Sequence, residues 1–338
     1  MIHIDIEKKL NSLGISITDF ENDYYGKISK NQFKIFKEKR DKPLTFLNIY
    51  NLNYSSPTTR KSNTQTKTIV EIFDFYYKND NSFSIFIDKF LKSLHKIYSS
   101  PEEFIKFILL LSPSELEKAK IEYDSIRPDG NIIEKLEKIF DYERDRNNIV
   151  SVIYKLDFRV CYYCNRNYIS NFSNKSQNRT TFTLDHYYQQ KEYPLFTLSL
   201  YNLIPACSVC NSLIKGKRKV NQYKNPYDKN YDFNKKVIFE LISKDKVELS
   251  TNDIDCENYI KDFYLNEIYE THKYDIKEFL NKRDIFTDEL IRSYATLSGV
   301  DDYIVKKSVF GEVIYNDSLD YEPLSKLKKD LASKLKLI

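Results

Sequence analysis

Apolar side chains recur at helical spacing through the first 150 residues of this chain. Positions three and four apart share one face of a helix, so such a stripe predicts an amphipathic helix. The clearest stripe consists of Ile132, Ile133, Leu136, Ile139 and Phe140. A further helix is predicted over 83–98, and the aromatic stripes of this region are typical of a core or a subunit interface.

Two helix starts in the same region carry capping residues. Ser100 and Ser112 are each followed by a proline, and a glutamate stands three residues after each serine. A serine N-cap, a proline in the first helical position and a glutamate in the third are typical of a helix N-terminus. By contrast, residues 53–67 are polar and lack periodicity, which predicts a long loop.

The last hundred residues change from strand patterning to helix patterning. Two short runs rich in Val, Ile and Phe within 237–250 predict a β-hairpin with its turn at 243–246. From about residue 258 onward the apolar positions return to helical spacing. The tail, 324–338, is predicted to be an amphipathic basic helix that packs on the body of the protein, with a partner or another surface as the alternatives.

The composition is that of an ordinary globular protein. Of 338 residues, 30% are charged and 41% are apolar, and no apolar run approaches the length of a membrane span. The first residues lack a signal-peptide pattern, so we expect a cytoplasmic protein with reduced thiols. The patterns together predict a mostly helical α+β protein, with a helical region over 1–150, a core over 151–235, and a β-hairpin followed by helices over 236–338.

The net charge of +4 is unevenly distributed. Residues 151–235 contain thirteen Lys or Arg and five Asp or Glu, a surplus of +8 that leaves −4 for the rest of the chain. A basic island in mildly acidic surroundings indicates a surface for a polyanion, although basic runs also occur as simple solvated faces.

Four of the five cysteines fall into two CxxC pairs. Cys161 and Cys164 form the first pair, Cys207 and Cys210 form the second, and forty-two residues separate them. Two such pairs provide the four thiolates of a tetrahedral zinc site. Because all four ligands would be protein thiolates, we expect a structural zinc ion with no open position. The fifth cysteine, Cys256, has no nearby partner in the sequence.

The segment between the pairs predicts a ββα unit of strand, loop, strand and helix. TFTLDHYY alternates as a strand that ends at Asp185 and His186, and SVCNSLIKGK begins a helix with Asn211 in or near its first turn. The carboxylate of Asp185 and the amide oxygen of Asn211 are hard ligands that suit Mg²⁺ or Mn²⁺. His186 points to the opposite face of the strand, where an imidazole can serve as general base toward a water molecule.

A basic cluster follows the predicted helix directly. It consists of Lys215, Lys217, Arg218 and Lys219. This position suits contacts to the phosphates on either side of a cut, and such contacts position a protein without reading sequence. We therefore expect nucleic-acid binding with low sequence specificity.

The run from Cys161 to Lys215 resembles the HNH, or ββα-metal, nuclease superfamily in its zinc-clipped form. The motifs that carry the resemblance are CYYCNRNYI, LDHYY and YPLFTLSLYNLIPACSVCNSLIK. With the following Asn225-Pro226-Tyr227, they are similar to the nuclease subunits of Septu-type antiphage defence systems, which act with an ATPase. The resemblance covers about 151–240, and the helical flanks match only loosely.

The resemblance implies a role for each residue of the motifs. It makes His186 the general base, assigns the catalytic Mg²⁺ or Mn²⁺ to Asp185 and Asn211, and gives Asn202 the task of bracing the loop that presents the base. The structural zinc ligands are Cys161, Cys164, Cys207 and Cys210. Cleavage in this family leaves 5′-phosphate and 3′-hydroxyl ends.

The residues and the resemblance together predict a metal-dependent endonuclease that hydrolyses phosphodiester bonds in DNA. The resemblance also implies antiphage defence with an ATPase partner. We expect the helical flanks to bind this partner or a second copy of the chain; alternatively, they complete a monomeric fold. Two other functions stay open, namely an RNA- or tRNA-cleaving HNH toxin and a zinc-containing nucleic-acid-binding module without catalysis.

Overall fold

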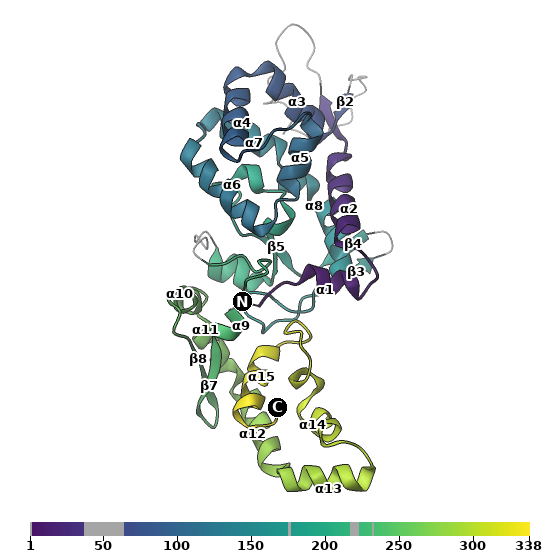
Figure 1. The fold of residues 1–338 in the computed structure, drawn as a ribbon, viewed down its shortest axis with the longest axis vertical. Coiled ribbons are helices and arrows are strands. Elements are labelled where there is room, and N and C mark those ends of the chain that lie inside the picture. Colours follow the sequence, from purple (N-terminus) through teal and green to yellow (C-terminus); the bar gives the residue numbers. More distant parts are fainter. Residues whose placement is uncertain (1, 37–63, 175–176, 217–222, 232) are drawn as a thin grey trace, which may run out of the picture. The chain divides into compact units, whose positions relative to one another are not determined.

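The computed structural model describes residues 2–36, 64–174, 177–216, 223–231 and 233–338 (Figure 1). Within these ranges the chain is mostly helical, and its strands form four two-stranded antiparallel sheets. This agrees with the mostly helical α+β class predicted from the sequence. None of the described helices combines the length and the apolar character that crossing a bilayer requires.

The chain divides into two units, each of which is assembled from segments that are not contiguous in the sequence. The larger unit comprises Met1–Ile17, Ile153–Gln189 and Tyr201–Ile338. The helical unit comprises Thr18–Val152 and Gln190–Leu200. The C-terminal helices therefore belong to the same unit as the cysteine pairs, and a short segment between the pairs belongs to the helical unit.

The helical unit buries apolar stripes of the kind expected from the sequence. On α7, Ile132 and Leu136 are buried, and Phe196 of the returning segment lies 6.5 Å from Phe90 and 5.8 Å from Tyr123 between ring centroids. The described elements are α2 (Ile17–Ser29), β1 (Phe33–Phe36), β2 (Thr64–Lys67), α3 (Ile69–Asn79), α4 (Asn81–Ser93), α5 (Pro101–Leu109), α6 (Pro113–Ile126), α7 (Gly130–Ile139), α8 (Tyr142–Ile153) and the 3-10 helix η3 (Pro194–Phe196).

Both predicted helix starts are confirmed by their cap geometry. α5 begins at Pro101 and α6 begins at Pro113. The hydroxyl oxygens of Ser100 and Ser112 accept the backbone N–H three residues further on. The Glu115 carboxylate in turn accepts the N–H of Ser112 at 3.1 Å, which completes a capping box.

Two predicted boundaries are corrected. The helix predicted over 83–98 is α4, which ends at Ser93 because His95 adopts a left-handed conformation with φ 53°. In the predicted loop, residues 53–63 lie outside the described residues, and Thr64–Lys67 forms strand β2. A distant segment, Phe33–Phe36, supplies the partner strand, so local sequence pattern did not reveal β2.

The larger unit combines three short hairpins with the C-terminal helices. Its described elements are α1 (Ile6–Asn11), η2 (Tyr154–Leu156), β3 (Asn171–Asn174), β4 (Gln177–Thr180), β5 (Thr183–His186), η4 (Leu200–Asn202), β6 (Leu203–Ala206), η5 (Val209–Lys215), α9 (Phe233–Lys236), β7 (Ile238–Ser243), β8 (Lys246–Ser250), α10 (Ile254–Asp262), α11 (Leu265–Tyr269), η6 (Glu270–His272), α12 (Lys273–Ile285), α13 (Asp288–Ser298), α14 (Asp302–Phe310), η7 (Glu312–Ile314) and α15 (Ser325–Lys334).

The predicted C-terminal hairpin and tail helix are both confirmed. β7 and β8 pair antiparallel, and Ser243 pairs with Lys246 at the turn. Leu327 and Leu331 of α15 are buried in the same apolar cluster as Phe239 of β7. The tail helix therefore packs on the body of the larger unit, because its apolar stripe meets one face of this hairpin.

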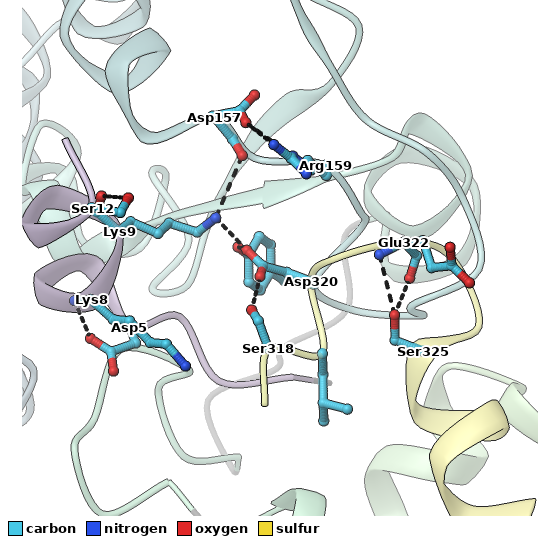
Figure 2. A network of polar contacts seen from close by, with 12 residues as sticks. Asp5, Lys8, Lys9, Ser12, Asp157, Arg159, Ser318, Asp320, Glu322 and Ser325 are labelled. Carbon is cyan, nitrogen blue, oxygen red and sulfur yellow. Dashed lines mark hydrogen bonds and ion pairs between the residues drawn. The ribbon is translucent and has the colours of Figure 1, made fainter. Parts of the chain in front are cut away.

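Both ends of the chain are tied to the first cysteine pair. The backbone N–H of Ile2 donates to the carbonyl of Tyr162 at 2.9 Å, and the Tyr162 hydroxyl donates to Asp320 at 2.5 Å. Figure 2 shows Lys9 of α1 reaching both the Asp157 carbonyl oxygen, 3.5 Å away, and the carboxylate of Asp320. These long-range contacts explain why the two ends of the chain fold with the cysteine pairs.

Candidate functional site

Four buried thiols converge in the larger unit. Cys161 and Cys164 lie in the turn that follows η2, Cys207 follows β6, and Cys210 lies on η5. Their Sγ atoms all lie within 4.8 Å of one another, and none forms a disulfide. Four free thiols at this separation are compatible with one tetrahedrally bound metal ion.

Backbone and amide groups already point hydrogen-bond donors at these sulfurs. The Cys207 N–H lies 3.3 Å from Cys161 Sγ, the Arg166 N–H lies 3.4 Å from Cys164 Sγ, and the Asn167 side-chain amide lies 3.2 Å from Cys207 Sγ. Such donors stabilise thiolates in metal sites. Burial raises the pKa of the Cys161 thiol.

A hairpin and a short helix follow one another around the thiol cluster. β5 and β6 pair antiparallel, with Asp185 opposite Ile204 and His186 opposite Leu203. η5 then carries Asn211 and has π-helical geometry. The thiol cluster joins the end of β6 to the start of η5. The order of β5, β6 and η5 is the strand, strand and helix order predicted from the sequence.

The carboxylate of Asp185 is buried and paired. Its Oδ2 atom accepts hydrogen bonds from the Tyr163 hydroxyl and from the Lys215 ammonium. Burial raises the pKa of Asp185, and the neighbouring Lys215 opposes that shift. Tyr163 stands between the two cysteines of the first pair, so the thiol cluster also determines where this carboxylate is held.

His186 is the next residue along β5 and is partly exposed. Successive side chains of a strand point to opposite faces, so the imidazole of His186 and the carboxylate of Asp185 lie on different faces of β5. Its backbone carbonyl accepts a hydrogen bond from Lys215 at 2.9 Å. The Asp-His dipeptide thus combines one buried carboxylate with one partly exposed histidine.

Asn211 approaches β5 on the same face as Asp185. Its side-chain amide donates to the Thr183 hydroxyl at 2.8 Å, and Thr183 stands two residues before Asp185 on the strand. Residues two apart on a strand share one face. The carboxylate and amide oxygens are the ligand types that Mg²⁺ and Mn²⁺ prefer, so this donor set fits such an ion in chemistry.

Asn202 is fully buried and holds the segment that follows His186. Its Oδ1 accepts the Tyr188 N–H at 2.7 Å, and its side-chain amide donates to the Tyr188 carbonyl at 3.2 Å. Its own carbonyl accepts the Tyr187 N–H at 2.8 Å. Three hydrogen bonds from one residue therefore fix the backbone just beyond the Asp-His dipeptide.

The Asn-Pro-Tyr motif lies against the same hairpin. The Asn225 amide donates to the Tyr201 carbonyl at 2.8 Å, and the Tyr227 hydroxyl donates to the Leu203 carbonyl at 2.8 Å. These bonds anchor the motif at the start of β6, so it serves as a support for the strand opposite Asp185 and His186.

Lys215, the first residue of the basic cluster, does not lie at the surface as expected. Lys215 was expected to contact phosphate, but it is only 3% exposed, because its ammonium turns inward to Asp185 and the His186 carbonyl. The other three members, Lys217, Arg218 and Lys219, lie outside the described residues.

Sequence reasoning missed two residues of the site. Tyr163 contacts Asp185, and Asn165, with φ 54°, bonds the C-terminal segment. Both stand in the CYYCNRNYI motif, in which only the cysteines were assigned roles from the sequence. Their position next to metal-ligand candidates was the available signal, but their partners are distant in sequence.

Comparison with known proteins identified no relative of this chain. No protein-family model matches it, and neither a curated protein nor a solved structure does.

Proposed function

We propose that this protein is a metal-dependent endonuclease that hydrolyses phosphodiester bonds in DNA, with an HNH-type core held by a structural zinc ion. The observation that carries the proposal is the arrangement on β5, β6 and η5. Asp185 and Asn211 approach one face of β5, His186 follows Asp185, and the four-thiol cluster joins the strands to the helix. Each residue matches its place in the motif order.

The side chains of the site have different proposed roles. Asp185 and Asn211 would hold a Mg²⁺ or Mn²⁺ ion, and Cys161, Cys164, Cys207 and Cys210 would hold zinc. When bound, the divalent ion supplies charge stabilisation at the scissile phosphate. His186 takes the proton from the attacking water, and Asn202 keeps the backbone beyond His186 in place.

A plasmid-nicking assay with Mg²⁺ or Mn²⁺ tests this proposal. His186→Ala should reduce the nicking rate by about 10²–10⁴-fold, the usual contribution of a general base. Zinc content and circular dichroism should stay unchanged. The control is His95→Asn, which replaces an exposed histidine of the helical unit. A fully active His186→Ala protein would exclude the mechanism.

The same assay separates the alternative functions. Cleavage of RNA or tRNA in place of DNA would favour the toxin. Binding of DNA without nicking in either metal, with every partner present, would favour a non-catalytic module. The ion pair between Lys215 and Asp185 favours the non-catalytic module, because the lysine occupies a proposed metal ligand.

The proposed biological role, antiphage defence with an ATPase partner, rests on the motif resemblance. Co-purification from the native gene cluster, with size measurement of the chain alone and with its neighbours, tests it. A chain that stays monomeric under all these conditions and cuts DNA freely would contradict the partner.

A further inference from the structure

One residue in the proposed site contacts both halves of the Asp-His dipeptide. The Lys215 ammonium reaches Asp185 Oδ2 and lies 2.9 Å from the His186 carbonyl oxygen. The two side chains of the ion pair are almost fully enclosed, with 1% of Lys215 and 8% of Asp185 exposed. The pair is therefore poorly screened by solvent, and salt alone would not separate it.

A divalent ion at Asp185 would meet this ammonium directly. Mg²⁺ binds carboxylate oxygens at about 2.0–2.1 Å, and Oδ2 already accepts from Lys215 and Tyr163. Two cations on one buried carboxylate repel each other strongly, because the local dielectric constant is low. The ion and the ammonium therefore compete for Asp185.

We propose that Lys215 is the resident counter-cation of Asp185, and that a divalent ion binds there only by displacing the Lys215 ammonium. This inference rests on the proposed function, since it concerns the same metal ligand. Lys215 thereby restrains the metal affinity of the free protein.

The end of η5 allows this displacement. Lys215 is the last residue of η5, and Gly216 follows with φ +50°, so the regular backbone ends at this point. A lysine has a long flexible stem, so its ammonium can leave Asp185 without movement of β5. A displaced ammonium is also free to contact a phosphate, which is the role first expected of Lys215.

The rival explanation is that the pair only stabilises the fold. The same unit contains a matched pair, because Lys326 is buried and its ammonium lies 2.8 Å from Asp330 in α15. Lys326→Met removes a buried lysine from an aspartate that has no proposed ligand role. It is therefore the control for Lys215→Met.

The test is calorimetric titration of the zinc-loaded protein with Mn²⁺. Lys215→Met should bind Mn²⁺ about ten-fold more tightly than the wild type, or better, since the competing ammonium is gone. Asp185→Asn should abolish this binding in both backgrounds, and Lys326→Met should bind as the wild type does. Equal affinity of Lys215→Met and wild type, with binding still lost in Asp185→Asn, would overturn the inference while leaving the proposed function intact.

One other result of the same titration would show that the proposed function itself is wrong. If Asp185→Asn leaves Mn²⁺ binding unchanged in both backgrounds, Asp185 is not a metal ligand, and the inference falls with that assignment. Should Lys215→Met not fold, acylation of wild-type lysines followed by mass spectrometry decides. Mg²⁺ should increase acylation of Lys215 several-fold and leave Lys326 unchanged; equal acylation of Lys215 with and without Mg²⁺ would overturn the displacement.

Discussion

Cys256 differs from the other four cysteines in the surroundings of its thiol. It lines a cavity of about 50 Å³ together with Tyr223, Phe233 and Tyr259. Burial, followed by the nearby Asp253 carboxylate, raises the pKa of Cys256 to about 11. This thiol is therefore protonated at neutral pH, and among the described residues it belongs to no group of metal-ligating side chains.

This difference predicts distinct pH-dependent reactivity. Only the thiolate reacts with an alkylating agent, and with a pKa of about 11 roughly one thiol in a thousand is ionised at pH 8. In zinc-loaded protein we expect one slowly labelled cysteine, whose rate rises about ten-fold per pH unit up to about pH 9.5. Mass spectrometry should identify it as Cys256, and Cys256→Ser should remove the signal without affecting nicking. A rate that levels off near pH 8.5 would contradict the raised pKa.

The turn that carries the first cysteine pair is an element held from far away in the chain. Asn165 has φ 54°, and its side-chain amide donates to the Leu319 carbonyl at 2.8 Å. Its Oδ1 accepts the Lys326 N–H at 2.9 Å, and its carbonyl accepts the Leu324 N–H at 2.6 Å. One asparagine thus joins the turn to the segment that leads into α15.

Asn165→Ala should destabilise the larger unit by about 2–4 kcal/mol. The substitution strains an alanine in the left-handed region, and it removes the hydrogen-bond partners of the partly buried Leu319 carbonyl and the buried Lys326 N–H. Glycine adopts the same φ without strain, so the smaller loss of stability in Asn165→Gly measures the contribution of the side-chain hydrogen bonds. Urea unfolding of zinc-loaded protein measures both variants. An Asn165→Ala midpoint equal to wild type would show that the C-terminal segment does not depend on this turn.

At the scale of the whole molecule, the thiol cluster is where the larger unit is held together. Residues from both ends of the chain bond to the turn between Cys161 and Asn165. Removal of a metal ion bound at the thiol cluster should therefore affect the entire larger unit, including α15, rather than the β5–β6 hairpin alone.

Metal analysis of the purified protein should find about one zinc per chain and little magnesium. Cys161→Ser or Cys207→Ser should give aggregation or loss of the folded larger unit, because a structural zinc contributes folding free energy directly. Cys256→Ser is the matched control and should remain soluble with full zinc content. A soluble, active Cys207→Ser protein would contradict the role of the cluster.

For helices and strands, most of the predictions that the structure confirms came from local sequence pattern. The caps at Ser100 and Ser112, the hairpin turn at Ser243 and the apolar stripe of the tail all depend on neighbours within a few residues. β2 was missed because its partner strand lies far back in the sequence.

By itself, the sequence determined which residues could do chemistry. The spacing of the CxxC pairs predicted that Cys161, Cys164, Cys207 and Cys210 would converge, because two thiols three residues apart can reach one ion and two such pairs complete a tetrahedron. Strand alternation likewise separated Asp185 from His186, because a β-strand has a fixed period of two.

Only the tertiary structure decided how these residues are held and paired. Lys215 was expected at the surface, yet it turns inward because Asp185, thirty positions away along the chain, is a buried carboxylate that needs a counter-cation. Asn165 and Tyr163 gained their roles in the same manner, from partners brought close by folding. Periodicity and spacing describe what a residue offers locally, whereas its partner, burial and charge environment depend on contacts between distant parts of the chain.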